Sequence, residues 1–435
     1  MRIGMILGDK LYPPDIRVDK EAEALIKKGF EVGLLTPVNS SAPKKKSPVE
    51  GVQLYRAQIP VFVLTSFCKR PPRFTPWPRA IVHHILRWHG YRIKSWSSVL
   101  GIDGWKFWRD GILPGWYSVI EKFILEFKPD VLHVHDFILV PSTLEVAEKY
   151  SIPVVADLHE NWPAQLDIDR QQPIPPDHIH GLNKYWSRKR CERLEKRNLV
   201  RCAKNIVVVP EAAERLLKYG IPQEKIHVVS NTEDESFDTG NIDSMIVDQY
   251  KDYWVASYIG GIGYHRGLET ILEAIPKFIK DAPNFLLLVV GASQQAQSFL
   301  LGEAEKLGIT KHIEIIGWKP SKLVKSYISA SEICLVPHRN MEHTNTTVPH
   351  KLFQYMLMSK PVLVSSCPPL KRIVEETKSG CVFTADDSDD AAKVLLKMYQ
   401  SNQLAEWGRN GEKNAKGKYS WKNDAQTLAD LYKTF

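Results

Sequence analysis

Two basic residues in the second half of the chain, Arg266 and Lys351, lie at positions that are typical of anion-binding sites. A short apolar run ends in Gly260-Gly261, and Arg266 follows just before a helical pattern begins. Further on, Lys351 follows Pro349 at the start of another helical pattern. Bare glycine amides, helix N-termini and a guanidinium group all favour phosphate oxygens. These residues predict a phosphate site, although a glycine-rich turn alone is equally compatible with a simple tight turn.

The first half carries histidines and carboxylates where two neighbouring apolar runs end. His135 and Asp136 follow one run, and Asp157, His159 and Glu160 close the next. Because ligands of open parallel sheets bind at the carboxyl ends of the strands, we expect these side chains to face one crevice. For Asp157, His159 and Glu160, capping of the following helix is the alternative interpretation.

The sequence His133-Val134-His135-Asp136 also admits a metal interpretation. Two histidines at a strand end begin several metal-dependent hydrolases, and His159 could add a ligand. The second half offers few further histidines as ligands. Alternation along the strand favours a core position for His133 and a crevice position for His135 alone. No metal and no cofactor are therefore predicted.

Three residues near the N-terminus also belong to the expected crevice. Gly8 ends the first apolar run, and Asp15 and Arg17 follow in what reads as a loop. A loop after the first strand of a parallel sheet faces the crevice, which makes both charged residues cleft candidates. The alternative is a surface ion pair between them, worth under about 1 kcal/mol.

The elements that would position these residues alternate between short apolar runs and helical patterns. Apolar runs cover residues 3–7, 31–35, 131–134, 153–156, 205–209 and 226–229, then 255–259, 285–290, 313–316, 333–336 and 362–365. Helices between nearly continuous apolar strands are typical of parallel α/β sheets.

This alternation predicts two tandem Rossmann-like domains with a ligand between them. The first covers residues 1–232 and the second residues 253–415, and the polar stretch 233–252 links them. We expect the final segment, 416–435, to form a helix that packs back on the first domain.

Size and composition set limits on the kind of protein. A chain of 435 residues exceeds one ordinary core. Its net charge of +8 suits an anionic partner such as a nucleotide diphosphate. Six scattered cysteines without a CxxC pair argue against a disulfide framework. The sequence shows neither a membrane-spanning apolar stretch nor a signal peptide, so a cytoplasmic location is predicted.

Residues 60–118 interrupt the α/β pattern and read as an insertion of amphipathic helices. Six of the 12 tryptophans lie between Trp77 and Trp116, and nine Lys or Arg residues lie between Lys69 and Arg109. Ordinary aromatic packing is one interpretation. Peripheral contact of residues 77–116 with anionic lipid, at the inner face of the plasma membrane, is the other favoured one. No nucleic-acid motif accompanies the charge, and no nucleic-acid partner is predicted.

In their order along the chain, these motifs resemble those of glycosyltransferase family 4. The donor-side likeness lies in SYIGGIGYHRGLETILEA and TTVPHKLFQYMLMSKPVLVSS, residues 257–274 and 346–366. The acceptor-side likeness lies in residues 15–35, 129–137, 154–163 and 206–231. The resemblance covers nearly the whole chain outside the insertion.

The resemblance implies a GT-B fold and metal-independent, retaining transfer from a UDP- or GDP-sugar. The acceptor would be a glycan or a lipid-linked glycan of surface polysaccharide assembly. Basic residues matching Arg266 and Lys351 hold the diphosphate in that family, and Gly8, Gly260 and Gly261 belong to the same expected donor site. His135 would lie by the transferred sugar, and we take His135 and Asp136 as candidate catalytic residues.

The chain departs from the family pattern at three positions. Many members carry two glutamates with seven residues between them, where this chain has Thr346 and Gln354. The residue matching Gln354 usually takes the ribose hydroxyls, which an amide can still bond. An arginine common after the first glycine is replaced by Gly261. A sugar-nucleotide epimerase and a non-catalytic nucleotide-sugar-binding protein are the alternative functions.

Overall fold

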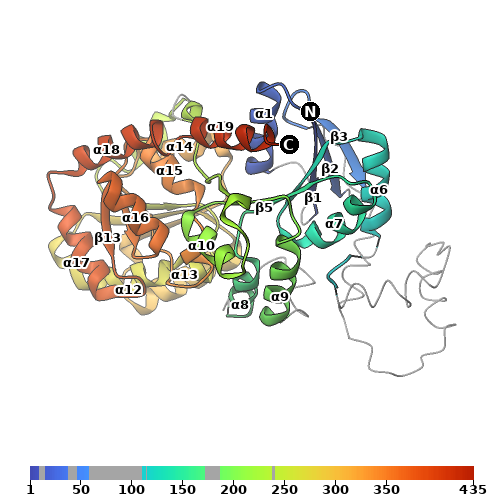
Figure 1. Cartoon of the computed structure of the whole chain (residues 1–435). Helices are drawn as coiled ribbons and strands as arrows, with labels where there is room; N and C mark the ends of the chain where they lie inside the picture. Colours follow the sequence, from blue (N-terminus) through green and yellow to red (C-terminus); the bar gives the residue numbers. More distant parts are fainter. Residues whose placement is uncertain (9–14, 38–46, 58–109, 114, 172–186, 238–240) are drawn as a thin grey trace, which may run out of the picture.

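The computed structural model describes residues 1–8, 15–37, 47–57, 110–113, 115–171, 187–237 and 241–435 (Figure 1). Two parallel β-sheets follow each other along this part of the chain. They confirm the predicted α/β architecture of two Rossmann-like units.

The first sheet has seven strands in the order β3-β2-β1-β4-β5-β6-β7, all parallel to their neighbours. They are β1 (Arg2–Leu7), β2 (Glu31–Pro37), β3 (Gln53–Ala57), β4 (Val131–His135), β5 (Val154–Leu158), β6 (Lys204–Val207) and β7 (Ile226–Val228). The chain reverses its winding between β1 and β4, which places the switch point of the sheet there.

Helices cover both faces of the first sheet because its central strands are apolar on both sides. The helices are α1 (Ile16–Lys27), α6 (Trp116–Phe127), α7 (Val140–Lys149), α8 (Trp162–Gln171), α9 (Arg188–Leu199) and α10 (Pro210–Lys218). Val18 and Leu25 of α1 share a core with Ile3 and Met5 of β1. The next β1 side chain, Ile6, belongs to the opposite core, with residues of α6 and α7.

The second sheet has six parallel strands in the order β10-β9-β8-β11-β12-β13, with its switch point between β8 and β11. They are β8 (Trp254–Ile259), β9 (Phe285–Ala292), β10 (Ile313–Gly317), β11 (Ile333–Val336), β12 (Val362–Ser365) and β13 (Gly380–Phe383). The helices are α12 (Leu268–Phe278), α13 (Gln294–Lys306), α14 (Ser321–Ser329), α15 (His350–Leu357), α16 (Pro368–Thr377), α17 (Ser388–Tyr399) and α18 (Leu404–Lys416).

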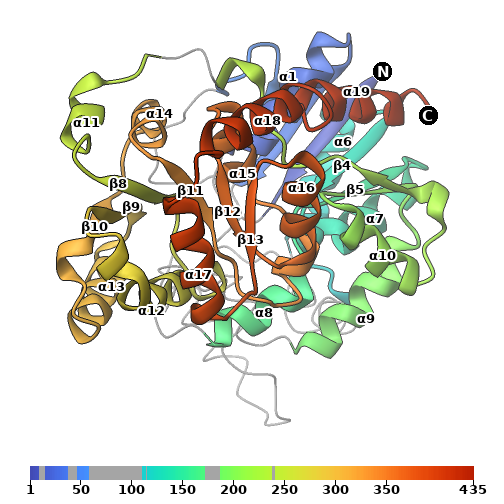
Figure 2. The same cartoon turned by 90° about the vertical axis from the view of Figure 1, so that its left-hand side faces the viewer.

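The last helix, α19 (Trp421–Tyr432), leaves the second sheet and lies against α1 of the first (Figures 1 and 2). Trp421, Leu428 and Tyr432 join the core formed by β1 and α1. In the stretch between the sheets, the short 3₁₀ helix η3 (Glu235–Phe237) and helix α11 (Ser244–Gln249) precede β8. The end of the chain therefore contributes to the core beside the first sheet.

The insertion expected at 60–118 is described only at its C-terminal end, since residues 58–109 and 114 lie outside the described part. Trp116 begins α6 and is 1% exposed, within the core of the first sheet. It cannot lie on a lipid surface, which corrects its inclusion in the membrane-contact segment. Among the described residues, no helix combines the length and the apolar character that crossing a bilayer requires.

Candidate active site

The carboxyl ends of β1, β4 and β5 bring the polar residues of the first half together. Strand register sets Leu7 beside His135, and His135 beside Asp157. Gly8 follows at the end of β1, and a Cβ atom at this position would lie 2.1 Å from the Leu139 side chain. Packing against Leu139 thus requires this glycine, whatever its part in donor binding.

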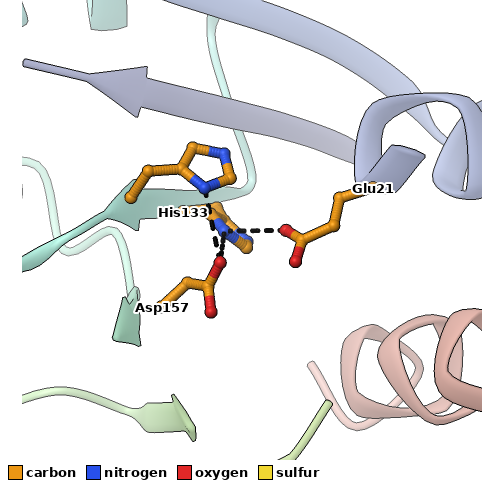
Figure 3. Close-up of side chains that lie close together, drawn as sticks. Glu21, His133 and Asp157 are labelled. Carbon is orange, nitrogen blue, oxygen red and sulfur yellow. Dashed lines mark ion pairs between the residues drawn. The ribbon is translucent and has the colours of Figure 1, made fainter. Parts of the chain in front are cut away.

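His133 and His135 lie on the same face of β4, so the prediction that only His135 faces the crevice was wrong. Side chains two residues apart on a strand share a face, and the two ring centroids are 4.4 Å apart. Asp157 Oδ2 lies 3.6 Å from His133 Nε2 and 3.4 Å from His135 Nδ1. Both rings are fully buried, and Figure 3 shows His133 between Asp157 and Glu21.

Arg17 enters this cluster from the first turn of α1. Its Nε and Nη2 atoms donate to the two carboxylate oxygens of Asp157 at 3.1 and 2.9 Å. Nη2 also lies 2.9 Å from Glu21 Oε1, one helical turn further along. Arg17 is 5% exposed and both carboxylates are fully buried, so the surface-pair interpretation was wrong. Asp15 caps α1 by accepting from the Arg17 and Val18 amides.

The surroundings of His135 and His159 give these two histidines opposite protonation states. Burial, together with the nearby His133, lowers the pKa of His135 to about 3. The ring nitrogens of His159 lie 3.5 Å from Asp136 Oδ2 and 2.7 Å from Asp157 Oδ2. Although burial opposes charge, these carboxylates raise the pKa of His159 to about 9. At neutral pH, His135 is a neutral imidazole and His159 an imidazolium.

The two buried carboxylates, Glu21 and Asp157, also have pKa values shifted in opposite directions. Burial and the charge of Asp157 raise the pKa of Glu21 to about 7. Burial opposes the charge of Asp157 as well, yet Arg17 and His159 hold the pKa of Asp157 well below its ordinary value. Asp157 is therefore the permanent anion, while Glu21 exchanges a proton near neutral pH.

Glu21, His133, His135 and Asp157 are the residues here that could hold a metal ion. One ligand atom from each lies within 4.8 Å of the others, and imidazole with carboxylate suits zinc. However, Arg17 already binds both carboxylates. With Arg17 and His159 positive, Asp157 and Asp136 negative and Glu21 half protonated, little negative charge is left to attract a divalent ion. The charge balance favours a proton-sharing network.

Asp136 has the most unusual backbone of this edge. Its φ of 59° and ψ of 161° belong to a region that is essentially reserved for glycine. Such a conformation costs about 1–3 kcal/mol and persists where the surroundings fix it. Here the Asp136 amide donates to the Asp157 carbonyl at 2.9 Å. The Asp136 side chain is 25% exposed and that of His159 12%, so both are accessible to solvent, whereas the His135 side chain is not.

At the carboxyl edge of the second sheet lies Lys351, which has, within the described ranges of the chain, no ion-pair partner of the kind seen at the first edge. Gly260 ends β8 with a φ of 130°, and a Cβ atom there would lie 2.9 Å from Lys351 Nζ. The ammonium lies 3.5 Å from the ring centroid of Tyr258. It is buried, with no hydrogen-bond partner among the described residues. Burial, reinforced by the charge of Arg266, lowers the pKa of Lys351 well below its ordinary value.

Arg266 lies beside Lys351 in the 3₁₀ helix η4 (Tyr264–Arg266), immediately before α12. Its Nη1 atom is 3.0 Å from His338 Nε2. Burial and the Arg266 charge keep His265 neutral by lowering its pKa to about 2. In the described part of the chain, no carboxylate lies within 4 Å of either cation. Gly261, on the same loop, is exposed and makes no close packing contact.

The two domains face each other across these edges. The Glu160 carboxylate, which is 52% exposed, lies 3.4 Å from His343 Nε2 of the second domain. Arg188 and Asn161 of the first domain contact Glu342 of the second. A pocket of about 400 Å³ opens at this junction. Its lining comes from both domains and includes Ala164, Asp167, Arg188, Tyr264, Arg339, Asn340, Met341, Glu342, His343 and Asp386.

Gln354 and Thr346, the positions that depart from the family pattern, make different contacts. Gln354 Nε2 donates to Glu233 Oε2 at 2.8 Å, and Lys20 Nζ lies 3.0 Å from Glu233 Oε1. The Thr346 hydroxyl donates to the Glu342 carbonyl of its own turn at 2.8 Å. Gln354 is thus in contact with a carboxylate, that of Glu233, which lies at the start of the predicted linker.

Two sequence profiles of known families match the chain. Residues 94–236 match glycosyltransferase family 4, and residues 243–414 match glycosyl transferases group 1. The two matches cover the C-terminal part of the first domain and nearly all of the second.

Whole-chain relatives carry related names. An uncharacterized glycosyltransferase of Methanocaldococcus jannaschii is 22% identical over 452 residues, which cover 100% of this chain and 98% of the relative. A phosphatidyl-myo-inositol mannosyltransferase of Mycolicibacterium smegmatis is 19% identical over 324 residues, 74% of this chain and 75% of that protein. Among solved structures, an Anabaena protein in complex with UDP has a TM-score of 0.65 at 13% identity, with both chains fully covered. That likeness concerns the fold.

Proposed function

The chain is a family 4-like GT-B glycosyltransferase, and from that premise we propose that it transfers a sugar, with retention of configuration, from a UDP- or GDP-sugar to a glycan or lipid-linked acceptor. One observation carries the donor half of this proposal. Lys351 and Arg266 form a pair of neighbouring cations with no carboxylate at ion-pair distance among the described residues. A diphosphate supplies the charge that such a pair lacks.

The same two cations stabilise the leaving group. Negative charge builds on the diphosphate as the sugar departs, and preorganised cations lower the energy of that state without a metal ion. The N-terminus of α12 follows Arg266 directly, and Lys351 lies in the first turn of α15. Both helix dipoles therefore add to the attraction. Transfer is proposed to proceed without a divalent cation.

Asp136 and His159 are proposed to contact the sugars from the first domain. Both side chains are partly exposed, and their carboxylate and imidazolium groups can bond hydroxyls of either substrate. His135 is proposed to position His159 rather than to contact the sugars, since its ring is buried and lies 3.3 Å from His159 Nε2. No side chain is assigned as a covalent nucleophile, and the donor phosphate oxygen is proposed to take the acceptor proton in a front-face attack.

The acceptor is proposed to belong to cell-surface glycan assembly. The name of the mycobacterial relative, a mannosyltransferase acting on a phosphatidyl-myo-inositol, supports a lipid-linked acceptor. Residues 77–109, with their tryptophans and basic residues, are proposed to bring the enzyme to an anionic membrane. They lie outside the described residues, so this contact rests on the sequence.

Turnover with labelled sugar nucleotides tests the proposal. Purified protein is incubated with radiolabelled UDP- or GDP-sugars and a membrane extract, and label is counted in the glycan and lipid fractions. We expect transfer by the native protein, with loss of at least about 30-fold in Lys351→Met since a charged contact of about 2 kcal/mol disappears. Lys397→Met, on the exposed face of α17, is the matched control and should retain full activity.

Two outcomes would contradict parts of the proposal. Release of free sugar and nucleotide without an acceptor would indicate an epimerase or hydrolase instead. Activity that is lost on dialysis against EDTA and restored by manganese would refute metal independence and direct attention to Glu21, His133 and Asp157. The anomeric configuration of the product, read by proton NMR, tests retention.

A further inference from the structure

The C-terminal helix places a tyrosine beneath the polar cluster of the first sheet. Tyr432, the last residue of α19, is fully buried. Its hydroxyl makes a hydrogen bond with His133 Nδ1, and the two rings are inclined by 30° with centroids 6.2 Å apart. α19 crosses back from the second domain to reach this position (Figures 1 and 2). The Tyr432 hydroxyl thus brings a group from the end of the chain into contact with the cluster.

The two ring nitrogens of His133 face different groups. Its Nε2 atom lies 3.4 Å from Glu21 Oε2 and 3.6 Å from Asp157 Oδ2 (Figure 3). Both distances are ion-pair distances rather than hydrogen bonds, and an ionised carboxylate such as Asp157 can only accept, so a hydrogen on Nε2 is the arrangement that suits this side of the ring. In a neutral imidazole, Nδ1 is then an acceptor. The Tyr432 hydroxyl donates to it, and burial keeps this hydroxyl protonated by raising its pKa.

We propose that Tyr432 is a positioning residue for the transfer reaction. By donating to His133 Nδ1, it fixes the hydrogen of His133 on Nε2, where it faces Asp157. Asp157 in turn holds His159 at 2.7 Å and Arg17 at 2.9 Å. The orientation of His159 at the cleft therefore depends on a hydroxyl group from the end of the chain. This inference rests on the proposed function, because it assigns Tyr432 to that reaction.

The contacts of α19 with the first domain support this dependence. Lys20 Nζ lies 4.7 Å from the ring centroid of Trp421, at the start of α19. The Thr232 hydroxyl donates to Asp424 in the same first turn of α19. Lys20 also pairs with Glu233, which binds Gln354 of the second domain. The helix that carries Tyr432 is thus anchored to residues that join the two domains.

Tyr432→Phe removes one oxygen and leaves the ring. Tyr250→Phe is the matched control, since Tyr250 is equally buried and its hydroxyl donates to Glu314 in the second domain at 3.0 Å. We expect kcat for transfer to fall about tenfold in Tyr432→Phe, the effect of one neutral hydrogen bond. The Kd for UDP or GDP should stay within about twofold of the native value, because the cations of the second sheet are untouched. Tyr250→Phe should leave kcat unchanged.

Imidazole nitrogen NMR supplies a readout that is independent of turnover. In ¹⁵N-labelled native protein, His133 should show Nε2 protonated and Nδ1 bare, and Tyr432→Phe should lose this single tautomer. Equal losses of kcat in both tyrosine variants, or an unchanged His133 tautomer in Tyr432→Phe, would overturn the inference. If the native protein transfers no sugar at all, the proposed function fails, while the tautomer measurement still tests the part played by Tyr432.

Discussion

The carboxyl edges of the two sheets carry charge in opposite arrangements. At the first edge, Arg17 is bound by Asp157 and Glu21, and His159 lies between two carboxylates. At the second edge, Lys351 and Arg266 are neighbours, and within the described part of the chain the charge of Arg266 reaches the Glu160 carboxylate only beyond ion-pair distance. The folds around both edges are alike, since each is the switch point of a parallel sheet. The contrast therefore comes from the side chains alone.

This contrast separates a site that is already complete from one that awaits a ligand. A paired buried network holds its groups in one geometry, because breaking any pair leaves a charge without a partner. Burial disfavours the charged form of Lys351 in the free protein, and an anion that binds beside Lys351 and Arg266 favours that charged form. The first edge thus suits the positioning of substrate hydroxyls, and the second suits a diphosphate.

The largest expected effect on stability comes from removing Arg17 from its ion pairs with Asp157 and Glu21. Arg17→Met should destabilise the protein by about 3–5 kcal/mol, because Asp157 and Glu21 then remain buried without their cation. Urea unfolding at pH 7.5 measures the difference. Arg188→Met is the control, since Arg188 also contacts acids, Asp167, Glu192 and Glu342, but is 34% exposed. It should cost under about 1 kcal/mol, and equal losses in the two variants would remove the contrast between paired burial and surface pairing.

Lys351→Met should have the opposite effect on stability. Burial disfavours the lysine charge in the free protein, so an apolar side chain of similar length should raise the melting temperature. The same change should cost about 2–3 kcal/mol in affinity for UDP or GDP, because a charged contact is lost. Thermal melts with and without 5 mM nucleotide, roughly saturating for a micromolar ligand, report both effects. A variant that melts lower than the native protein yet keeps its nucleotide-induced shift would contradict the account of this edge.

His159 should make stability depend on pH between about 6.5 and 9. Its pKa is raised to about 9 in the folded protein, so its contribution is complete below the unfolded value near 6.5 and disappears as pH rises through 9. We expect the native protein to lose on the order of 2 kcal/mol more than His159→Gln between pH 6 and pH 9.5. Parallel urea titrations at the two pH values give this difference. Indistinguishable pH profiles for both proteins would show that His159 is not held between the carboxylates.

The smallest effect is expected where the domains meet. Gln354→Glu would place a second carboxylate against Glu233, which Gln354 now contacts at 2.8 Å. Like charges at this distance should weaken the contact by about 1 kcal/mol at pH 8 and by less at pH 4.5, where one group takes up a proton. Denaturant unfolding at both pH values checks this. Destabilisation of equal size at the two pH values would exclude charge repulsion as its cause.

The alternation of apolar runs and helical patterns predicted most of the fold. It failed at β3 and β13, each at one edge of its sheet, although the opposite edge strands β7 and β10 were predicted. In β3 and β13, Gln53 to Tyr55 and Gly380 to Val382 show no clear alternation in burial. The return of the final helix to the first domain was expected, whereas its contact with His133 depends on tertiary packing that no local pattern contains.

The site was predicted in its residues better than in its contacts. Runs that end in histidine and aspartate marked the first edge, and glycines with basic residues marked the second. Sequence alone misplaced His133 because residues two apart on a strand share a face rather than alternate. It also missed Glu21, one helical turn after Arg17, and Glu233, because their partners lie far away in the chain. The spacing of Arg17 and Glu21 was a signal that could have been used.

Calorimetric titration with UDP and GDP, in two buffers of different ionisation enthalpy, tests the central claim most directly. The pKa of Lys351 is lowered in the free protein by burial and by Arg266. A bound diphosphate favours the charged form, so its binding should take up protons and weaken as pH rises. We expect tight binding with proton uptake in the native protein, and weaker binding with little uptake in Lys351→Met. Tight binding without any proton uptake, or equal affinity in the variant, would contradict the claim that these unpaired cations hold the donor diphosphate.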